Sequence, residues 1–306
     1  MPEPVIEAEN VAKKYGQVTA LENISLSIAK GEVIGILGPN AAGKTTLVSI
    51  ISGLRHPTYG RVRVDGKDVF KDRSAIRSSI GMVFQGTSLD PKLTVKESLM
   101  LHASLFDMDE NLIDKAVQET MIEFGLHRIH GQLIENLSGG QRQLVEVAKS
   151  LVHSPRIFIF DEPTVGLDPE VRKLIWDKIR EISQGGGNTV IITSHYLEEI
   201  EQLCGRVYFL KRGRLVGSDS IAGLKSQYGR LVSFSVAGSV RKEALEKILG
   251  IQLIDSGGAF YFRQGSEIPV SEIVKKLSAK RIEVKDISSK EASLEQVYLR
   301  VMGDSK

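Results

Sequence analysis

A glycine-containing loop limits the possible folds of this 306-residue chain more than any other part of the sequence. Residues 33–37 form an apolar run that predicts a buried strand, and an apolar helix is expected at 44–51. The residues that join them follow the pattern G-x-x-x-x-G-K-T, and they are Gly38, Pro39, Asn40, Ala41, Ala42, Gly43, Lys44, Thr45 and Thr46. Backbone N–H groups of such a loop, together with the helix N-terminus, bind phosphate oxygens. The sequence therefore predicts a nucleotide-phosphate site.

Two side chains of the loop add chemistry that the backbone lacks. Lys44 would place a mobile positive charge at the β- and γ-phosphate oxygens, and the Thr45 hydroxyl can bind Mg²⁺. A nucleoside triphosphate and Mg²⁺ are therefore the expected ligands. The loop pattern alone does not choose among ATPases, GTPases and kinases.

A second apolar run, residues 157–160, ends in two adjacent carboxylates, Asp161 and Glu162. The carboxyl end of a strand is where an α/β sheet places its ligand chemistry. Asp161 is the candidate Mg²⁺ ligand, directly or through water, and Glu162 is the candidate general base for the attacking water. A strand that simply ends in solvent would show the same letters, so this run alone leaves both interpretations open.

Apolar runs alternate with helical stretches along the first two thirds of the chain. Bare apolar runs are typical of strands buried on both faces of a parallel sheet, so we expect an α/β fold with a parallel core sheet. The expected strands are residues 5–9, 24–28, 33–37, 62–64, 82–84, 157–160, 190–193 and 207–211. The expected helices are residues 44–51, 110–124, 141–152, 170–182 and 196–203.

The pattern changes after about residue 223 and indicates a second domain at 227–306. A chain of this length has room for two domains. The order of expected elements, β-α-β-β-α-β followed by a last helix, predicts a small α+β domain of the ferredoxin-like class. Its strands are expected at 231–236, 251–255, 260–263 and 282–287, and its helices at 241–249, 270–279 and 293–301.

Composition excludes several classes of protein. The chain is 42% hydrophobic and 25% charged, which is ordinary for a globular protein. Its 40 Lys+Arg against 38 Asp+Glu are too balanced for an electrostatic nucleic-acid binder. The single cysteine, Cys204, fits a reducing compartment. Residues 1–14 lack the apolar stretch of a signal peptide, and no apolar run approaches the roughly 18 to 20 residues that span a bilayer.

A third motif stands between the phosphate loop and the two carboxylates, and it consists of Leu137, Ser138, Gly139, Gly140 and Gln141. Alone it could be an ordinary helix cap or a second anion-binding device. In this order the three motifs resemble those of the nucleotide-binding subunits of ATP-binding cassette (ABC) transporters, over roughly residues 4–220. The resemblance implies a P-loop NTPase cassette at 1–223, with an antiparallel β subdomain and a helical subdomain at about 86–150.

The resemblance also implies roles for further residues. Tyr15 would stack on adenine, although an aromatic at a strand end could instead pack on the core. Gln85 would be the Q-loop glutamine that reaches Mg²⁺ and the attacking water, with a free surface glutamine as the alternative. His195 would be the switch histidine at the γ-phosphate, unless it is purely structural. The D-loop would consist of Gly166, Leu167 and Asp168.

Two residues depart from the family pattern. Ala41 stands where the family's loop usually has glycine, and a Cβ there either strains a backbone of positive φ or crowds the phosphates. We therefore expect Ala41 to weaken catalysis without abolishing it. Val165 replaces the serine often found before Gly-Leu-Asp.

Partners follow from the resemblance as well. Cassettes of this family dimerise head to tail, so each ATP lies between the phosphate loop of one chain and the LSGGQ segment of the other. One copy of each motif per chain implies a second copy of this chain, or a homologous cassette, as partner. A separate transmembrane permease would dock near residues 93–99, at the cytoplasmic face of a prokaryotic cell membrane. No nucleic acid and no direct insertion into the bilayer are expected.

The C-terminal domain resembles the accessory domain of exporter-type cassettes, which serve antibiotic, drug, sodium and polysaccharide efflux. It could also merely cover a sheet edge or aid dimerisation. The alternative function is a soluble ABC ATPase that acts in translation or on DNA, but those relatives carry two cassettes or long coiled-coil insertions. A small-molecule kinase or GTPase is disfavoured by the LSGGQ segment and His195. The cargo has no signature in the sequence.

Overall fold

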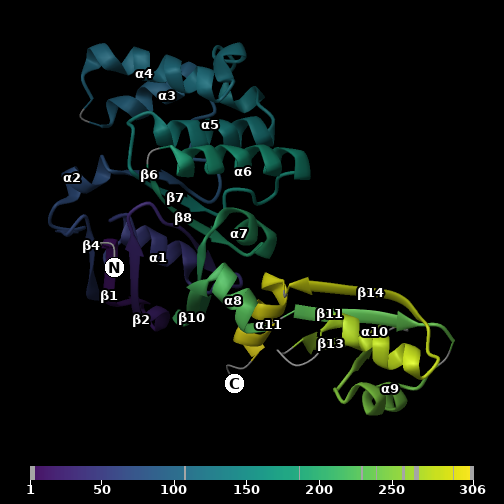
Figure 1. Cartoon of the computed structure of the whole chain (residues 1–306). Helices are drawn as coiled ribbons and strands as arrows, with labels where there is room; N and C mark the ends of the chain where they lie inside the picture. The colour runs from purple at the N-terminus through teal and green to yellow at the C-terminus, as the bar shows by residue number, and fades with distance from the viewer. Residues whose placement is uncertain are drawn as a thin grey trace. The chain divides into compact units, whose positions relative to one another are not determined.

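The chain forms two compact units, Met1–Asp219 and Ser220–Lys306 (Figure 1). The computed structural model describes residues 4–106, 108–185, 187–228, 230–238, 240–256, 259–264, 269–291 and 293–303. Among these residues, no helix combines the length and the apolar character needed to cross a bilayer.

The first unit is built on a six-stranded sheet. Its strand order is β10-β9-β3-β8-β7-β6, and the pairs β9·β3, β3·β8, β8·β7 and β7·β6 are parallel. The strands are β3 (Val33–Leu37), β6 (Ile80–Val83), β7 (Ile157–Asp161), β8 (Thr189–Ser194), β9 (Arg206–Lys211) and β10 (Arg214–Ser220). Every residue of β7 and β8 is buried, which confirms the parallel core sheet. The carboxyl ends of β3, β6, β7 and β8 consequently lie along one edge.

Helices connect these strands and bury one apolar side each. The helix α1 (Lys44–Ile51) starts where the phosphate loop ends. The helix α6 (Pro169–Gln184) begins at a strong start signal, because the Asp168 side chain accepts a hydrogen bond from Val171 N and Pro169 occupies the first turn. Its buried residues Ile175, Ile179 and Ile182 recur every three to four positions, as an amphipathic helix requires. The short helix α7 (Leu197–Leu203) follows β8.

An antiparallel sheet lies beside the core sheet, as expected (purple in Figure 1). It contains β1 (Pro4–Tyr15), β2 (Val18–Ala29), β4 (Tyr59–Val64) and β5 (Lys67–Asp68) in the order β2-β1-β4-β5. The strands β1 and β2 are longer than the expected segments 5–9 and 24–28. The prediction was too short because both strands contain bulges. Asn10 and Asn23 have positive φ angles of 49° and 52°, and the register shifts beside Asn10. Bulges break the alternation on which a strand prediction depends.

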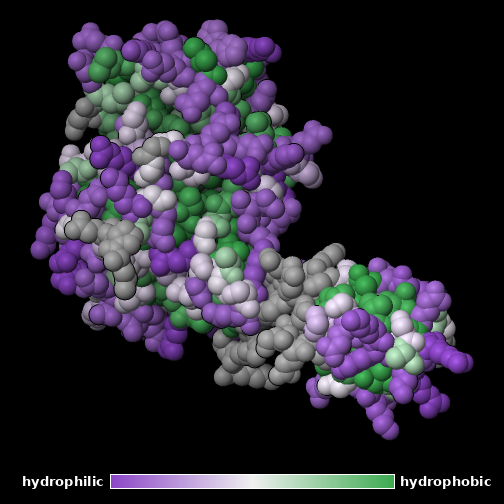
Figure 2. Space-filling view, viewed as in Figure 1, coloured by the Kyte–Doolittle hydropathy of each residue, from purple (hydrophilic) through white to green (hydrophobic). Residues whose placement is uncertain are grey.

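The helical subdomain is formed by α3 (Val95–Ser104), α4 (Glu110–Glu123) and α5 (Gly139–Leu151), with 3₁₀ turns at Leu126–Arg128 and Ile134–Asn136. The helix α3, like the short α2 (Arg73–Arg77), was not predicted. The sequence nevertheless contains a start signal for α3, because Thr94 and Glu97 form a reciprocal capping box. Figure 2 shows the outer surface around α4 as mostly hydrophilic. Leu112 and Ile122 are exposed apolar residues of this helix.

Because His102 of α3 has a lowered pKa, we expect the folding stability of the helical subdomain to fall in acid. Burial, the Lys149 ammonium and His153 lower the pKa of His102 to about 3. The unfolded chain binds this proton near pH 6.5, so the folded state loses stability as the pH falls from about 6.5 towards 3. At pH 5 the loss from His102 is about 2 kcal/mol. The urea midpoint of a His102→Phe chain should therefore fall less between pH 7 and pH 5 than that of the wild type. The exposed His127→Phe serves as control, and equal acid losses in all three chains would contradict the prediction.

The second unit has its own core. Its elements are α8 (Ile221–Tyr228), β11 (Arg230–Val236), α9 (Lys242–Leu249), β12 (Ile254–Ser256), β13 (Ala259–Gln264), α10 (Val270–Ala279), β14 (Val284–Glu291) and α11 (Leu294–Gly303). The sheet order is β12-β13-β11-β14, with all pairs antiparallel. Phe234, Phe260 and Phe262 pack from the sheet against Leu245 of α9 and Ile273 of α10. The assignment of this unit to the ferredoxin-like class stays a prediction.

Candidate functional site

The phosphate loop has the backbone that its sequence predicts. It joins β3 to α1, and two of its glycines are required by space and by backbone angle. A Cβ on Gly38 would lie 2.3 Å from the Leu210 carbonyl oxygen, and Gly43 has a φ of +106°. The loop residues 40–46 line a cavity of about 260 Å³ together with Ala20, Gln85 and Glu162. The cavity therefore brings the phosphate loop, Gln85 and the candidate base together.

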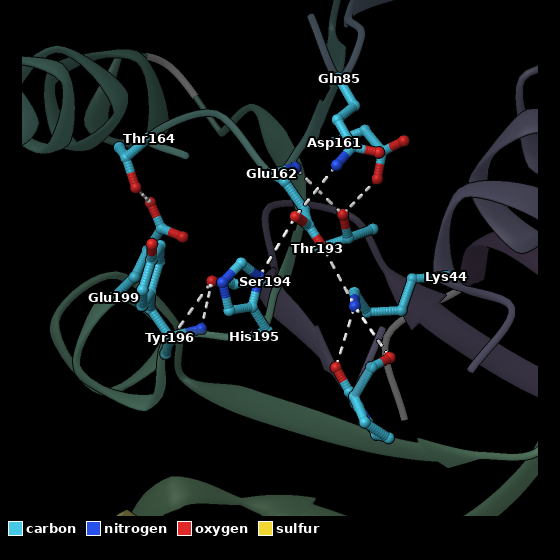
Figure 3. A network of polar contacts seen from close by, with 12 residues as sticks. Lys44, Gln85, Asp161, Glu162, Thr164, Thr193, Ser194, His195, Tyr196 and Glu199 are labelled. Atoms are coloured by element: carbon cyan, nitrogen blue, oxygen red, sulfur yellow. Dashed lines mark hydrogen bonds and ion pairs between the residues drawn. The ribbon is translucent and has the colours of Figure 1, made fainter. Parts of the chain in front are cut away.

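Lys44 and Glu162 are joined directly across this cavity (Figure 3). Lys44 Nζ lies 2.9 Å from Glu162 Oε1, and both side chains are less than a tenth exposed. The same ammonium donates to the carbonyl oxygens of Gly38, at 2.9 Å, and Pro39, at 3.2 Å. A buried ion pair of this kind is stabilised by additional hydrogen bonds to each partner. Lys44 is thus held at the mouth of the phosphate loop.

The second carboxylate oxygen of Glu162 contacts the other two predicted catalytic residues. Gln85 Nε2 lies 3.3 Å from Glu162 Oε2, and His195 Nδ1 lies 3.2 Å from the same atom. Gln85 follows β6, Glu162 follows β7 and His195 follows β8, so three neighbouring strand ends supply them. Figure 3 shows the three side chains pointing toward one another. His195, which is half-buried, and Gln85, which is exposed, thus both contact Glu162, and their catalytic roles stay predictions.

Thr193, which sequence reasoning missed, fixes the two carboxylates. Its hydroxyl donates to Asp161 Oδ1, while Glu162 N donates to Thr193 O at 3.0 Å and lies 3.1 Å from Thr193 Oγ1. These bonds hold Glu162 in a left-handed backbone with φ of 52°. Non-glycine residues in that region carry strain, and such strain concentrates at functional sites.

One carboxylate oxygen of Asp161 makes no hydrogen bond to the described residues. This atom, Oδ2, is buried. Burial raises the pKa of Asp161, and the hydroxyls of Thr193 and Thr45 act in the opposite direction. A buried carboxylate oxygen without a partner, close to a threonine hydroxyl, is a donor set that suits a small hard cation such as Mg²⁺. The residues present therefore fit the metal that the sequence predicts.

The LSGGQ segment caps a helix and lies outside this cavity. Ser138 is the N-cap of α5: its Oγ accepts from Gln141 N at 3.2 Å, and Gln141 Oε1 accepts from Ser138 N at 2.9 Å. Gly139 and Gly140 form the first turn, and Leu137 is buried. Among the described residues, none of these five lines the cavity around Lys44. An ordinary cap is thus present, and the segment does not complete the phosphate site of its own chain.

Tyr15 is not a core residue. It ends β1, is 39% exposed, and has Lys13 Nζ 5.1 Å from its ring centroid. Arg55 donates to its hydroxyl at 3.3 Å. The partly exposed ring is available for stacking, and its role in binding adenine stays a prediction.

The expected D-loop leads into α6. Gly166 has a positive φ of 76°, and the Asp168 carboxylate serves as the N-cap of the helix. Leu167 lies between them, and Val165, which replaces the usual serine, is 41% exposed.

Glu199 is a second polar residue that sequence reasoning missed. It is fully buried on α7, where its Oε1 accepts from Thr164 Oγ1 at 2.7 Å (Figure 3). The same oxygen accepts from Trp176 Nε1 at 3.0 Å. Burial raises the pKa of this carboxyl group. Its hydrogen-bond partners lie 35 and 23 residues away in the chain, so no local pattern in the sequence marks it. Glu199 ties the segment that follows Glu162 to the helix that follows His195.

Ala41 carries the backbone strain that its sequence position suggested. Its φ of 62° lies in the left-handed region, where a Cβ costs about 1 to 2 kcal/mol. Ala41→Gly should relieve this strain and raise ATP affinity or kcat by up to about 5- to 30-fold, since 1.4 kcal/mol corresponds to about a factor of ten. Steady-state ATPase assays and nucleotide titrations of the two chains test this. An unchanged rate and affinity would mean that the site tolerates the methyl group.

Comparison with known proteins agrees with this geometry. Residues 21–165 match the family described as ABC transporter. The chain is 33% identical to the daunorubicin resistance ATP-binding protein DrrA3 of Streptomyces coeruleorubidus, over 100% of this chain and 98% of the relative. It is 31% identical to the linearmycin resistance ATP-binding protein LnrL of Bacillus subtilis, over 98% of each. It is 36% identical to the Nod factor export ATP-binding protein I of Paraburkholderia xenovorans, over 73% of each.

Solved structures with the same fold are ATP-binding cassettes. One is a dimeric cassette in a post-hydrolysis state bound to ADP and Pi, with a TM-score of 0.65, 30% identity, and coverage of 71% of this chain and 98% of that one. Another is cbiO1 of Clostridium perfringens, with a TM-score of 0.66, 28% identity, and coverage of 80% and 94%. The order of motifs, the site around Glu162 and these similarities agree: the chain belongs to the ABC transporter family, as an ATP-binding and ATP-hydrolysing subunit.

Proposed function

We propose that this chain is the ATPase subunit of an exporter, and that it drives a separate membrane permease by closing as a head-to-tail dimer on ATP. The observation that carries the proposal is the convergence of Lys44, Gln85 and His195 on one carboxylate, that of Glu162. The names of full-length relatives, which refer to drug resistance, support export as the direction. The partner cassette is a second copy of the chain or a homologue.

Lys44 changes partner during the cycle. Its ammonium forms an ion pair with Glu162 in this structure, and the β- and γ-phosphates of ATP are stronger anions that compete for it. When Lys44 turns to the phosphates, Glu162 loses its cation and its carboxylate becomes free to accept a proton from the attacking water. His195 and Gln85 then remain near the Glu162 oxygen, where they hold the γ-phosphate and the water. Binding of ATP therefore activates the base.

Asp161, Thr45 and Gln85 would hold Mg²⁺ in the loaded site. The unpartnered Oδ2 of Asp161 supports this assignment. A bound Mg²⁺ neutralises charge on the phosphate oxygens during transfer. The loop residues 38–46 bind the phosphates through backbone N–H groups, and Tyr15 stacks on adenine.

The other half of each site comes from the partner. The LSGGQ segment, residues 137–141, lies outside the cavity of its own chain, which supports its use on the ATP held by the other cassette. Residues 166–168 act as the D-loop at the same interface. Closure then assembles each site from two chains.

The cassette domain corresponds to residues 1–223, with the helical subdomain at about 86–150, and residues 227–306 are the accessory domain. The permease docks near residues 93–99, at the cytoplasmic face of a prokaryotic membrane. Neither nucleic acid nor direct bilayer insertion is part of the function.

Coexpression with the candidate permease tests the proposal. The chain should sediment with membranes only when the permease is present, and the purified complex in lipid vesicles should hydrolyse ATP faster when its cargo is added. The Glu162→Gln complex is the control, because it should associate with the membrane but neither hydrolyse ATP nor transport. A chain that stays in the supernatant with every permease tested, and hydrolyses ATP alone, would support the soluble ATPase instead.

A further inference from the structure

A buried carboxylate on α5 holds the segment that follows Gln85. Glu146 is only 1% exposed, although it lies in the middle of a helix of the helical subdomain. Its Oε1 accepts from Ser88 N and, at 3.3 Å, from Thr87 Oγ1. Ser88 Oγ lies 3.1 Å from Oε1 and 3.0 Å from Oε2. One carboxylate therefore binds backbone and side-chain donors of two successive residues.

A lysine one turn further along α5 completes this cluster. Lys149 Nζ lies 2.7 Å from Glu146 Oε2 and also donates to Ser88 Oγ. The Lys149 side chain is only 10% exposed. Burying two charges costs free energy, which is offset only when further hydrogen bonds satisfy both groups, as Ser88 does here. We call Glu146, Lys149 and Ser88 the α5 clamp.

The α5 clamp joins two parts of the catalytic machinery. Ser88 follows Gln85 by three residues, so the clamp restrains the chain directly beside the Q-loop glutamine. Ser138, the N-cap of α5, precedes Glu146 by eight residues, or about 12 Å along one helix. One helix, α5, thus carries the LSGGQ segment at its start. Further along the same helix, Glu146 and Lys149 bind Ser88 of the segment that follows Gln85.

We propose that Glu146 and Lys149 are positioning residues that set Gln85 relative to the LSGGQ helix. The inference rests on the proposed function, because the position of Gln85 matters only if Gln85 acts on the ATP of its own chain. In a head-to-tail dimer the LSGGQ segment of that chain binds the partner's ATP. When α5 moves as its LSGGQ segment binds the partner's ATP, the α5 clamp moves Gln85 with it. The position of Gln85 in one ATP site therefore depends on whether the other site holds ATP.

The test removes the clamp without leaving a lone buried charge. Glu146→Leu with Lys149→Met replaces the ion pair by apolar side chains of similar length, an exchange that often leaves stability unchanged. We expect a melting temperature close to that of the wild type, an unchanged affinity of the monomer for ATP, and a kcat reduced about 10- to 100-fold through misplacement of Gln85. The matched control is Lys115→Met with Glu119→Leu, which removes an exposed pair of α4 and should leave kcat unchanged.

A mutant cycle separates positioning from general damage. In a Gln85→Ala background the clamp variant should cause no further loss of kcat, because the residue that it positions is already missing. An equal fold-loss in both backgrounds, or no loss in the wild-type background, would overturn the inference. The proposed function is measured separately, by ATP-dependent dimerisation of a Glu162→Gln chain with an intact clamp. If that dimer forms while the cycle is additive, the inference fails and the function stands.

Discussion

A Glu162→Gln chain should bind ATP with at least wild-type affinity and lose about 10²- to 10⁴-fold in kcat, the usual contribution of a positioned general base. The amide has the shape of the carboxylate, so its contacts with Gln85 and His195 can persist in altered polarity. It cannot accept a proton from water. It also carries no negative charge to hold Lys44, whose ion pair with Glu162 is 2.9 Å long. Nucleotide binding should therefore be retained, and the ATP-bound dimer should accumulate.

Single-turnover hydrolysis and sedimentation velocity with ATP check the two halves of this prediction. The exposed Glu198→Gln on α7 is the matched control and should hydrolyse ATP at the wild-type rate. Hydrolysis at the wild-type rate by the Glu162→Gln chain would remove Glu162 from the role of base.

Lys44→Met should weaken ATP binding about 10- to 100-fold, the cost of losing one charge-assisted hydrogen bond to phosphate. Hydrolysis should fall further, because the β- and γ-phosphate oxygens would lack their positive partner. The substitution also frees Glu162 from its ion pair, so any surviving activity should not require displacement of a lysine.

Equilibrium titration with a fluorescent ATP analogue measures the first effect, and ATPase assays at saturating ATP measure the second. Lys67→Met, at an exposed position of β5, is the control with unchanged affinity. Wild-type affinity in the Lys44→Met chain would show that the backbone of the loop suffices for phosphate binding.

Local patterns predicted the parts of the site that local geometry determines. The strand, loop and helix around Lys44 are continuous in sequence, so the order of residues is enough to locate the phosphate loop. The same holds for Asp161 and Glu162, since an apolar strand that ends in carboxylates is a local feature. What the sequence does not contain is strand order. Gln85, Glu162 and His195 meet because β6, β7 and β8 are neighbours in the sheet.

Buried polar residues were the main omissions. Glu146 and Glu199 lie on helices, where a charged residue is expected to face solvent. Their burial depends on partners far away in sequence: Ser88 is 58 residues from Glu146, and Thr164 is 35 residues from Glu199. Periodicity within a helix cannot report such partners. The lengths of β1 and β2 were underestimated for a related reason, because the bulges beside Asn10 and Asn23 interrupt the alternation that marks a strand.

Complementation between two inactive chains tests the shared site most directly. A Glu162→Gln chain lacks its own base, and a Ser138→Arg chain lacks a working LSGGQ segment, so neither homodimer should hydrolyse ATP. A heterodimer that forms when the two are mixed before ATP is added has one intact site, with Glu162 from one chain and Ser138 from the other. The account predicts that an equal mixture regains up to about a quarter of the wild-type rate, because half of the dimers are mixed and each has one of two sites. A mixture no more active than the separate chains would contradict it.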